Sequence, residues 1–591
     1  MKRITRREIL RRIAGISVLG AAGAAIGVTG MRAANTPDVR PLASHPINPS
    51  TVARSRMATT TVLGSPSTSV GHANHATNPS AGSIATTGST SQATAGSPET
   101  TGPSSTSATT ATATGAPPTS SAPPVAAVGT SELSGALGPT VVPAGAIAKI
   151  VGDVELRGDL VVEGLLTSVD TFILRGNGFQ IEVRNGGQVD FRGVPKSGWV
   201  RGAAPSGWQA GDRILTAPTE PGRYALSDFH TGAPGAVTLA DGRTIVAEQF
   251  NLTRSITIDN ISRIMFHMGA GRQVLKHVAV TNSGVAGQLG FYPVHFHLNG
   301  DTTRGSIVEG VVVENARFRA FVPHGSHGIT FLDCVAHQIS GEAFWWDFPP
   351  SKNDRSNDSN DIVWQHCLAS SLSAVDESNG HRLAGFVLGN GSGNRCIDCT
   401  AVGVQGGQNS SGFHWPEKAQ AVWGFRGCVA HNNISDGVFC WQNNLNIHRV
   451  EDFIAFRCGR AGIENGAYSN NFQYVNASLT DTTRGIISHA LTRDENNPLA
   501  FENVVANNDL VISKHRVASS SAVVFKRCRF PRVVVNEVGE EGAQPGIHQM
   551  FDTGLQPGDF DIEGSHSASV IQLFEQGSLQ WEWAGGSWNS K

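Results

Sequence analysis

Apolar residues recur in a short, repeated pattern along the second half of the chain. From Leu275 onward, an apolar residue is followed three positions later by Cys, Val or Phe, and two positions after that by Ala or Val. Side chains of a strand alternate between two faces, so this pattern predicts short strands that bury one face. The copies are Leu275/Val278/Val280, Val308/Val311/Val313, Phe331/Cys334/Ala336, Trp364/Cys367/Ala369, Cys396/Cys399/Ala401, Phe425/Cys428/Ala430, Val450/Phe453/Ala455, Phe472/Val475/Ala477, Phe501/Val504/Ala506 and the partial copy Phe525/Cys528.

The spacing of these copies predicts a solenoid. Successive middle positions lie 33, 23, 33, 32, 29, 25, 22, 29 and 24 residues apart. A shortest step near 22 residues, lengthened by variable loops, is typical of a parallel β-helix. A β-propeller would need about 40 residues per blade. We therefore expect an all-β protein that folds as a right-handed parallel β-helix.

A second strand follows the first in each coil and carries the residues of interest. Its inward anchors are Phe321, Phe344, Phe386, Phe413, Val438, Ile463 and Ile486, and Val294 takes the same place in the stretch from Tyr292 to Asp301. Residues one and three positions after an anchor face outward. Coils lie about 4.8 Å apart, so His297, His324 and Asp347 are expected on three successive coils. His295, Trp345 and His414 are expected beside them, with Trp441 further along the same face.

Composition sets the domain boundaries. Residues 35–140 are rich in Ser, Thr, Ala and Pro and contain no Phe, Trp or Tyr, so they are predicted to be a disordered linker. We expect a glycine-rich β region at 141–260, the β-helix repeats at 261–540 and a C-terminal cap or tail at 541–591. The net charge of −3 shows no excess of basic residues of the kind that binds nucleic acid.

Residues 1–34 are predicted to be a targeting segment. Arg6 and Arg7 precede an uncharged stretch from Ile13 to Met31, which resembles a bacterial twin-arginine export signal. An ordinary secretory signal or a retained membrane anchor are the alternatives. We expect an exported protein of the bacterial cell envelope or exterior, monomeric, and attached to a membrane only if this segment is not cleaved.

The eight cysteines allow a disulfide framework in an exported protein. However, Cys334, Cys367, Cys399, Cys428 and Cys528 all occupy the middle position of the repeat, which points inward. We therefore predict a stacked ladder of free, buried thiols. The pair Cys396 and Cys399 has no second pair to complete a zinc site.

The predicted face of His, Asp and exposed Trp favours a polysaccharide as partner, and three chemistries fit it. Glycoside hydrolysis needs two carboxyl groups about 5 to 9.5 Å apart, with Asp347 as the first and Asp301, Glu342 or Glu417 as the second. His297, His324 and Asp347 also suit a transition metal. Lyase chemistry on a uronic acid would use a histidine as base. The structural alternatives are that Asp347 caps a turn and that His324 and His327 bond nearby carbonyl groups.

One motif resembles a known family. The stretch Tyr292-Pro-Val-His-Phe-His-Leu-Asn-Gly-Asp301 is similar to the signature of the family of the cell-migration-inducing hyaluronidase and its transmembrane relative. Residues 320–328, 341–347 and 250–258 support the resemblance, and residues 141–192 look like that family's G-eight domain. The family has Arg before the Tyr-Pro pair, where this chain has Phe291.

The resemblance implies a β-helix that depolymerises or binds hyaluronan or another acidic polysaccharide, with calcium as a candidate cofactor beside a transition metal. We predict a glycosidase-type hydrolase; a non-catalytic glycan-binding module and a polysaccharide lyase are the alternatives. The predicted catalytic residues are Asp347, His297, His324 and Asp301. The predicted substrate-binding residues are His295, Trp345, His414, Trp441 and Glu417, and the predicted metal ligands are His297, His324 and Asp347.

Overall fold

The computed structural model describes residues 130–205, 207–345, 358–374, 383–407, 410–416, 421–440, 446–491, 498–513, 522–536, 546–563 and 569–591. The export signal, most of the linker, Asp347, Glu417 and Trp441 lie outside the described residues.

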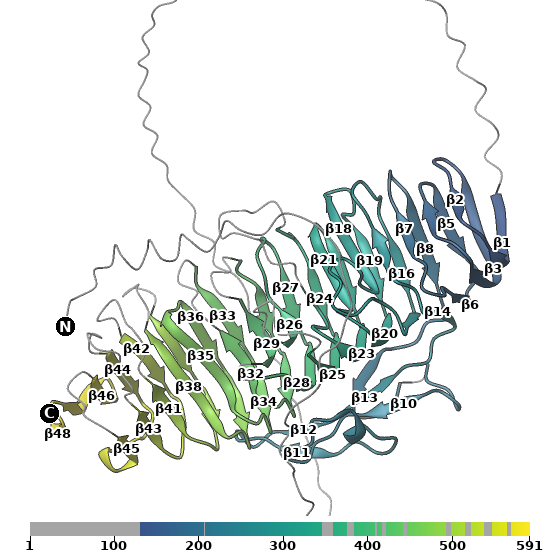
Figure 1. The fold of residues 1–591 in the computed structure, drawn as a ribbon. Helices are drawn as coiled ribbons and strands as arrows, with labels where there is room; N and C mark the ends of the chain where they lie inside the picture. The colour runs from purple at the N-terminus through teal and green to yellow at the C-terminus, as the bar shows by residue number, and fades with distance from the viewer. Residues whose placement is uncertain are drawn as a thin grey trace, which may run out of the picture. The chain divides into compact units, whose positions relative to one another are not determined.

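The described chain folds as the predicted right-handed parallel β-helix (Figure 1). Each coil contributes one strand to each of three parallel sheets. The first sheet contains β5 (Leu165–Ser168), β8 (Gln188–Arg192), β16 (Val274–Lys276), β19 (Ser306–Glu309), β22 (Ile329–Leu332), β24 (Val363–Gln365), β27 (Arg395–Ile397), β30 (Gly424–Arg426), β33 (His448–Glu451), β36 (Phe472–Val475), β39 (Leu499–Glu502), β42 (Ala522–Lys526), β44 (Gly546–Phe551) and β46 (Ser569–Glu575).

The second sheet follows in each coil after a sharp turn. It contains β6 (Phe172–Arg175), β14 (Ile256–Asp259), β17 (Val278–Thr281), β20 (Val312–Ala316), β23 (Val335–Ser340), β25 (Leu368–Ser373), β28 (Thr400–Gln405), β31 (Val429–His431), β34 (Ile454–Phe456), β37 (Ser478–Thr480) and β40 (Val505–Ala506). The longer strands β1 (Thr130–Leu137) and β3 (Ile147–Leu156) run through both the first and the second sheet, because β3 pairs with β5 and with β6.

The third sheet carries the predicted anchors. It contains β2 (Thr140–Val142), β4 (Leu160–Val162), β7 (Ile181–Val183), β15 (Ile264–Phe266), β18 (Val294–Gly300), β21 (Phe321–Ser326), β26 (Ala384–Val387), β29 (Ser411–Trp415), β32 (Asp436–Cys440), β35 (Ala461–Ser469), β38 (Arg484–Leu491), β41 (Leu510–Ser513), β43 (Val533–Asn536) and β45 (Phe560–Glu563). Single bridges from Phe344 to Phe321 and to Phe386 join β21 to β26. All the predicted anchors from Val294 to Ile486 therefore pair in one continuous column.

The turn between the first and second sheets explains which residues precede the middle position of the repeat. Asp333, Asp398, Gly427 and Asp452 all have positive φ values, between 52° and 67°. Only glycine, and to a lesser degree Asp and Asn, adopts this left-handed conformation at low cost. The chain therefore reverses direction at each of these residues and turns the next side chain into the core.

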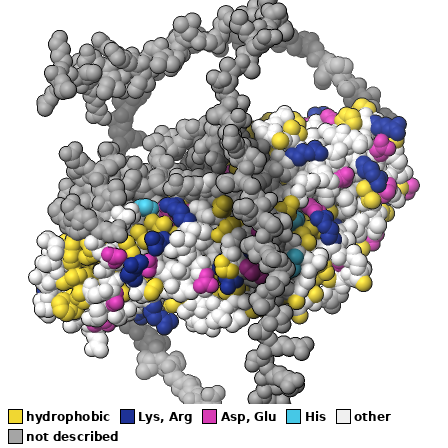
Figure 2. Space-filling view, turned by 60° about the horizontal axis from the view of Figure 1, so that its bottom comes forward, with side chains coloured by type: hydrophobic (Ala, Val, Ile, Leu, Met, Phe, Trp, Pro, Cys, Tyr) yellow, Lys and Arg dark blue, Asp and Glu magenta, His cyan; other side chains and the backbone are white. Residues whose placement is uncertain are grey.

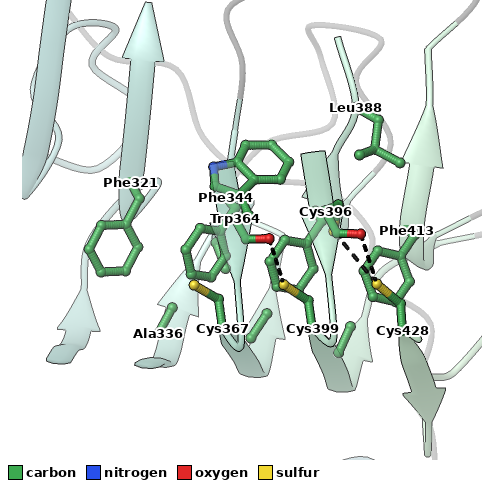
Figure 3. Packing of buried hydrophobic residues seen from close by; sticks show 14 of the residues in the cluster. Phe321, Ala336, Phe344, Trp364, Cys367, Leu388, Cys396, Cys399, Phe413 and Cys428 are labelled. Carbon is green, nitrogen blue, oxygen red and sulfur yellow. Dashed lines mark hydrogen bonds between the residues drawn. The ribbon is translucent and has the colours of Figure 1, made fainter. Parts of the chain in front are cut away.

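The cysteine ladder is confirmed. All eight cysteines are free and buried. Figure 3 shows Cys367, Cys399 and Cys428 stacked on successive coils, under the rings of Phe344 and Phe413. The Sγ atoms of Cys396 and Cys428 are 3.8 Å apart, so the thiols pack as neighbours without a covalent bond.

One coil of the predicted repeat was assigned to the wrong register. The structure pairs Val450 with Tyr474 and Tyr474 with Phe501, whereas Phe472 pairs with His448. The repeat in this coil is therefore Tyr474/Ala477/Leu479. Phe472 and Tyr474 lie two positions apart on one strand and are both buried, so alternation of apolar residues could not distinguish them.

Glycines before the anchors allow the second and third sheets to approach each other. A Cβ atom at Gly437 would lie 2.5 Å from the carbonyl oxygen of Gly462 and 2.9 Å from the Cβ atom of Ala455. Gly385, Gly412, Gly462 and Gly485 are equally confined on neighbouring coils. The Ala residues that end the repeat pattern complete this narrow contact.

An insert between β8 and β14 covers the outer side of the second sheet. It contains β9 (Trp199–Arg201), β10 (Ile214–Thr216), η1 (Leu226–Asp228), β11 (Ala236–Thr238), β12 (Thr244–Val246) and β13 (Glu248–Asn251). Trp199 of β9, Phe250 of β13 and Phe229, which follows η1, pack against Val335 and Val402 of the second sheet.

The coils continue across the expected boundary at residue 260, because β6 pairs with β14 and β14 with β17. At the C-terminal end, β46, β47 (Ser578–Ala584) and β48 (Ser587–Ser590) form an antiparallel cap, which follows η3 (Pro557–Asp559) and β45.

On the face drawn in Figure 2, basic and acidic side chains are interspersed rather than gathered by sign. In the described part of the chain, no helix has the length and apolar character needed to cross a membrane.

Candidate active site

The histidines lie on two adjacent strands of the third sheet. Strands β18 and β21 pair in parallel, with Val294 opposite Phe321 and His297 opposite His324. Val294 and Phe296 are fully buried in the core of the solenoid. Because side chains alternate along a strand, His295 and His297 point to the other side, as predicted.

A β-bulge interrupts β18 directly after His297. The register with β21 shifts between His297 and Gly300, and Leu298 adopts a left-handed conformation with φ 52°. This conformation costs a residue such as leucine about 1–2 kcal/mol. The side-chain amide of Asn299 donates to the carbonyl oxygen of Phe266 at 2.8 Å and fixes the end of the strand. Such bulges redirect neighbouring side chains, here those beside His297.

The strand pairing brings three imidazoles together. The Nδ1 atoms of His297 and His324 are 3.2 Å apart. One ring nitrogen of each of His295, His297 and His324 lies within 4.8 Å of the others. Among the described residues, this is the one group of three or more His, Cys, Asp or Glu side chains that is arranged to hold a metal ion. The structure therefore places His295, predicted as a substrate-binding residue, in the same cluster as the two predicted metal ligands.

His295 is the most buried member of the cluster, with 1% of its surface exposed. Its Nδ1 atom lies 3.1 Å from the carbonyl oxygen of Gly290. A carbonyl can only accept, so Nδ1 carries the proton and Nε2 keeps its lone pair. Burial, followed by the nearby His297 and His324, lowers the pKa of His295 well below its usual value. The His295 ring is therefore neutral at physiological pH.

A fourth histidine extends the group toward the N-terminal coils. The ring of His267 is stacked on that of His297, with centroids 5.5 Å apart, and its Nδ1 atom lies 3.4 Å from Glu182. The sequence reasoning missed both residues. His267 lies three positions after the inward Ile264, in the place of His297 after Val294, so extending the column by one coil would have found it.

Two of the predicted carboxylates are engaged elsewhere. Asp301 is exposed and lies 2.8 Å from Arg304, whose hydrogen bond lowers the pKa of Asp301. Glu342 is buried and lies 2.7 Å from Arg319. Neither belongs to the histidine cluster. Asp347 and Glu417, the other predicted acids, lie outside the described residues.

The prediction of an exposed Trp345 is wrong. The side chain faces away from the solenoid core but is 2% exposed, within a cluster that includes Tyr292, Phe318 and Val322. The guanidinium of Arg319 lies 3.6 Å from the centre of the Trp345 ring. Alternation gave the direction of the side chain correctly but could not show that neighbouring side chains cover it, so its ring is not open for stacking on a sugar.

His414 does not lie beside the cluster. The column runs from Val322 past Trp345 and Val387 to His414, three coils away, which corresponds to about 14 Å. His414 is buried and packs against Phe439, with ring centroids 5.6 Å apart. Its predicted role in substrate binding would therefore belong to another part of the face. Trp441 lies outside the described residues.

A pair of buried carboxyl groups lies further along the same sheet. Asp436 and Glu464 are almost fully buried, and Arg460 contacts both. His489 lies 3.0 Å from Glu464. Burial, and then the charge of Glu464, raises the pKa of Asp436 well above its usual value. Glu464 was placed in the outward column by the sequence, but no role was predicted for it.

A family model described as CEMIP beta-helix matches residues 261–347. These are the coils that carry the histidine cluster and Trp345. Human fibrocystin-L is 35% identical over 89 residues, which cover 14% of this chain and 2% of that protein. Human cell surface hyaluronidase CEMIP2 is 23% identical over 217 residues, which cover 29% of this chain and 14% of that protein.

The chain therefore spans only a small part of the length of the curated relatives it matches. Among solved structures, the tailspike protein gp49 of Pseudomonas phage LKA1 is similar at a TM-score of 0.28 and 12% identity, over 73% of this chain and 75% of that one. The predicted resemblance to the hyaluronidase family is thus supported for residues 261–347. The G-eight resemblance stays a prediction.

Proposed function

We propose that the chain is a polysaccharide-active enzyme of glycosidase type whose site is the outer side of β18 and β21. One observation carries this proposal. The segment that matches the CEMIP β-helix model is the segment in which His295, His297 and His324 lie within 4.8 Å of one another. A cluster of imidazoles is a group that can move protons at a reacting oxygen.

Asp347 is proposed as the principal acid, with His297 and His324 assisting it. It is the last residue of the matched segment and lies three positions after the anchor Phe344. The column that pairs His297 with His324 would continue to it on the next coil. We keep Asp301 as a second catalytic candidate, although its ion pair with Arg304 favours the ionised form and therefore a base rather than a proton donor.

The proposed substrate is hyaluronan or another acidic polysaccharide. Support comes from the printed name of CEMIP2, a cell surface hyaluronidase, at 23% identity over part of the chain. We also propose that the protein is a monomer exported through the signal at residues 1–34 and held away from the cell surface by the linker at 35–140. Detection of a mature protein that lacks residues 1–34 in the culture medium or envelope would test this export.

The binding-module alternative loses its main argument in this structure. A module that binds sugars by stacking needs exposed aromatic rings, and Trp345 is buried beneath Arg319. Lyase chemistry stays compatible with the cluster, because a histidine can remove the proton beside a uronic acid carboxylate. Hydrolysis and elimination give different products, so one assay separates them.

The test is a reducing-end assay on the purified chain with hyaluronan, other acidic polysaccharides and neutral ones. New reducing ends without ultraviolet absorbance of unsaturated sugars would identify a hydrolase, and new ends with that absorbance a lyase. Asp347→Asn is expected to lower turnover by about 10²–10⁴-fold, the usual contribution of an acid–base group. Retention of a polymer without any cleavage, by wild type under all conditions, would overturn the enzymatic proposal.

A further inference from the structure

The geometry of the histidine cluster points to a bound ion. We propose that His295, His297 and His324 hold a divalent first-row transition ion, for which zinc is the probe, through Nε2 of His295 and Nδ1 of the other two. This inference goes beyond the proposed activity, because the protein can hold a metal whether or not it cleaves a polysaccharide.

The distance between ring nitrogens on the two strands fits two ligands of one metal ion. Zinc–nitrogen bonds are about 2.0–2.1 Å long, so two nitrogens on one tetrahedral ion lie about 3.3 Å apart. The Nδ1 atoms of His297 and His324 are 3.2 Å apart across the pairing of β18 and β21. The third nitrogen, from His295, lies within 4.8 Å of both.

The orientation of His295 is that of a metal ligand. A ligating histidine usually donates its other ring N–H to a carbonyl or carboxylate, which fixes the tautomer. Nδ1 of His295 has this bond to Gly290, and the same carbonyl oxygen accepts from Arg263 at 3.4 Å. Arg263 also lies 4.3 Å from the centre of the Phe291 ring, so the loop that supplies the carbonyl is held in place.

The second ring nitrogen of His295, Nε2, accepts no hydrogen bond from the described residues. Nε2 is buried and has no hydrogen-bond partner among the described residues. A buried acceptor in this state is unfavourable, because it has lost its hydrogen bond to water without gaining another. A direct hydrogen bond between His297 and His324 would account for the 3.2 Å distance, but it would leave Nε2 of His295 unsatisfied. A metal ion accounts for both observations.

The donor set selects the class of ion. Three imidazole nitrogens suit zinc, cobalt, nickel or copper. Calcium prefers six to eight oxygen ligands, and the described cluster contains no carboxylate. The structure therefore favours the transition metal among the two cofactors predicted from the sequence.

The experiment uses the full chain, stripped with a chelator and dialysed against zinc or cobalt(II). Elemental analysis is expected to give one ion per chain, and the cobalt form is expected to absorb visible light as a tetrahedral site does. Zinc is expected to raise the melting temperature, because it binds only the folded state, whereas calcium at the same concentration is not.

The variants His295→Gln and His324→Gln are each expected to lower zinc affinity by at least about 100-fold, the upper range for loss of an outer-sphere partner. The matched control is His327→Gln, because His327 lies on the same segment but contacts Asn360 and is outside the cluster. Circular dichroism checks that each variant folds.

Two results would overturn the inference. One is a wild-type chain that retains no zinc after dialysis, which would leave a hydrogen bond between His297 and His324 as the full account. The other is equal retention by wild type and His295→Gln, which would assign the metal to some of the other histidines among the 20 in the chain. Since neither readout depends on turnover, failure of the metal site and failure of the proposed activity are distinguishable.

Discussion

The second and third sheets both carry buried histidines on their outer sides, and these histidines meet different neighbours. On the second sheet, His337 and His431 lie in one outward column beneath the insert. His337 bonds to Ser370 at 3.0 Å, and His431 lies 2.7 Å from Glu248. On the third sheet, the three histidines of the cluster lie against one another instead.

This difference separates a structural histidine from a candidate functional one better than burial does. His337 packs between the rings of Phe229 and Phe250, and His431 is stacked on Phe456 at 4.3 Å. Each is covered and has a partner from another element, which attaches the insert to the solenoid. In the cluster, imidazole nitrogens converge on one point with no carboxylate among the described residues to occupy it.

The largest expected effect is the loss of the partner of His431. Glu248 is buried and contacts both His431 and Arg201, each at 2.7 Å. Glu248→Ala leaves two donors without an acceptor, so the free energy of unfolding should fall by about 3–5 kcal/mol. Denaturant unfolding measures the loss, and limited proteolysis should show earlier cleavage in the insert.

Glu248→Gln is the control for this change, because its amide oxygen keeps one acceptor. It should cost clearly less than the alanine variant. A loss below about 1 kcal/mol for Glu248→Ala would mean that the apolar contacts of Trp199, Phe229 and Phe250 alone hold the insert.

Buried histidines of the first and second sheets predict how stability depends on pH. Burial lowers the pKa of His337 to about 3 and those of His448 and His548 to about 4. In the unfolded chain these groups titrate near 6.5, so the unfolded state binds more protons between about pH 6.5 and 3. The free energy of unfolding should therefore fall steadily as the pH is lowered through this window.

Glu248 adds a second, lower window. Burial opposes its ionisation, but His431 and Arg201 outweigh burial and lower the pKa of Glu248 to about 2. Its contribution of about 3 kcal/mol is present above pH 4.5 and is lost between 4.5 and 2. Unfolding curves at a series of pH values test both windows, and Glu248→Gln should flatten the lower one alone. Equal stability at pH 7 and pH 4 would contradict the assignment of the buried histidines.

Much of the fold was predictable because every coil of a solenoid carries the same pattern of apolar positions. Each coil gave an independent estimate of the register, so the anchors from Val294 to Ile486 were placed correctly, as were the direction of His297 and His324 and the inward cysteines. The register failed at Phe472, where two buried aromatic residues lie two positions apart on one strand.

The site was predictable only in part. Alternation along a strand gives the direction of a side chain, but it does not show whether neighbouring side chains bury it. Trp345 points outward and is still buried, and His414 lies three coils from the cluster rather than within it. The bulge after His297 depends on a left-handed Leu298 that no pattern indicates. The pairing of Glu248 with His431 joins residues 183 positions apart and has no signal in the sequence.

A smaller effect is expected when a covered histidine is removed. In His337→Leu, Ser370 keeps its bond to the carbonyl oxygen of Ala336 at 3.2 Å, so no buried group loses its last partner. The unfolding free energy at pH 7 should change by about 1 kcal/mol, and zinc binding should not change. His295→Leu on the other face should instead abolish zinc binding while retaining the fold. Loss of zinc binding in His337→Leu would contradict the distinction between structural histidines on the second sheet and metal-binding histidines on the third.

The smallest expected effect concerns Asp301, which follows the strand of His295 and His297 and forms an ion pair with Arg304. Its carboxylate is exposed and shared with Arg304, and exposed ion pairs contribute little to stability. Asp301→Asn should leave the unfolding midpoint and zinc binding unchanged. Cleavage of polysaccharide by this variant decides the role of Asp301, because persistent turnover, in contrast to Asp347→Asn, would remove Asp301 from the catalytic candidates. A loss of turnover with an intact fold would instead show that Arg304 positions Asp301 for catalysis, and that a partnered carboxylate on this face is part of the site.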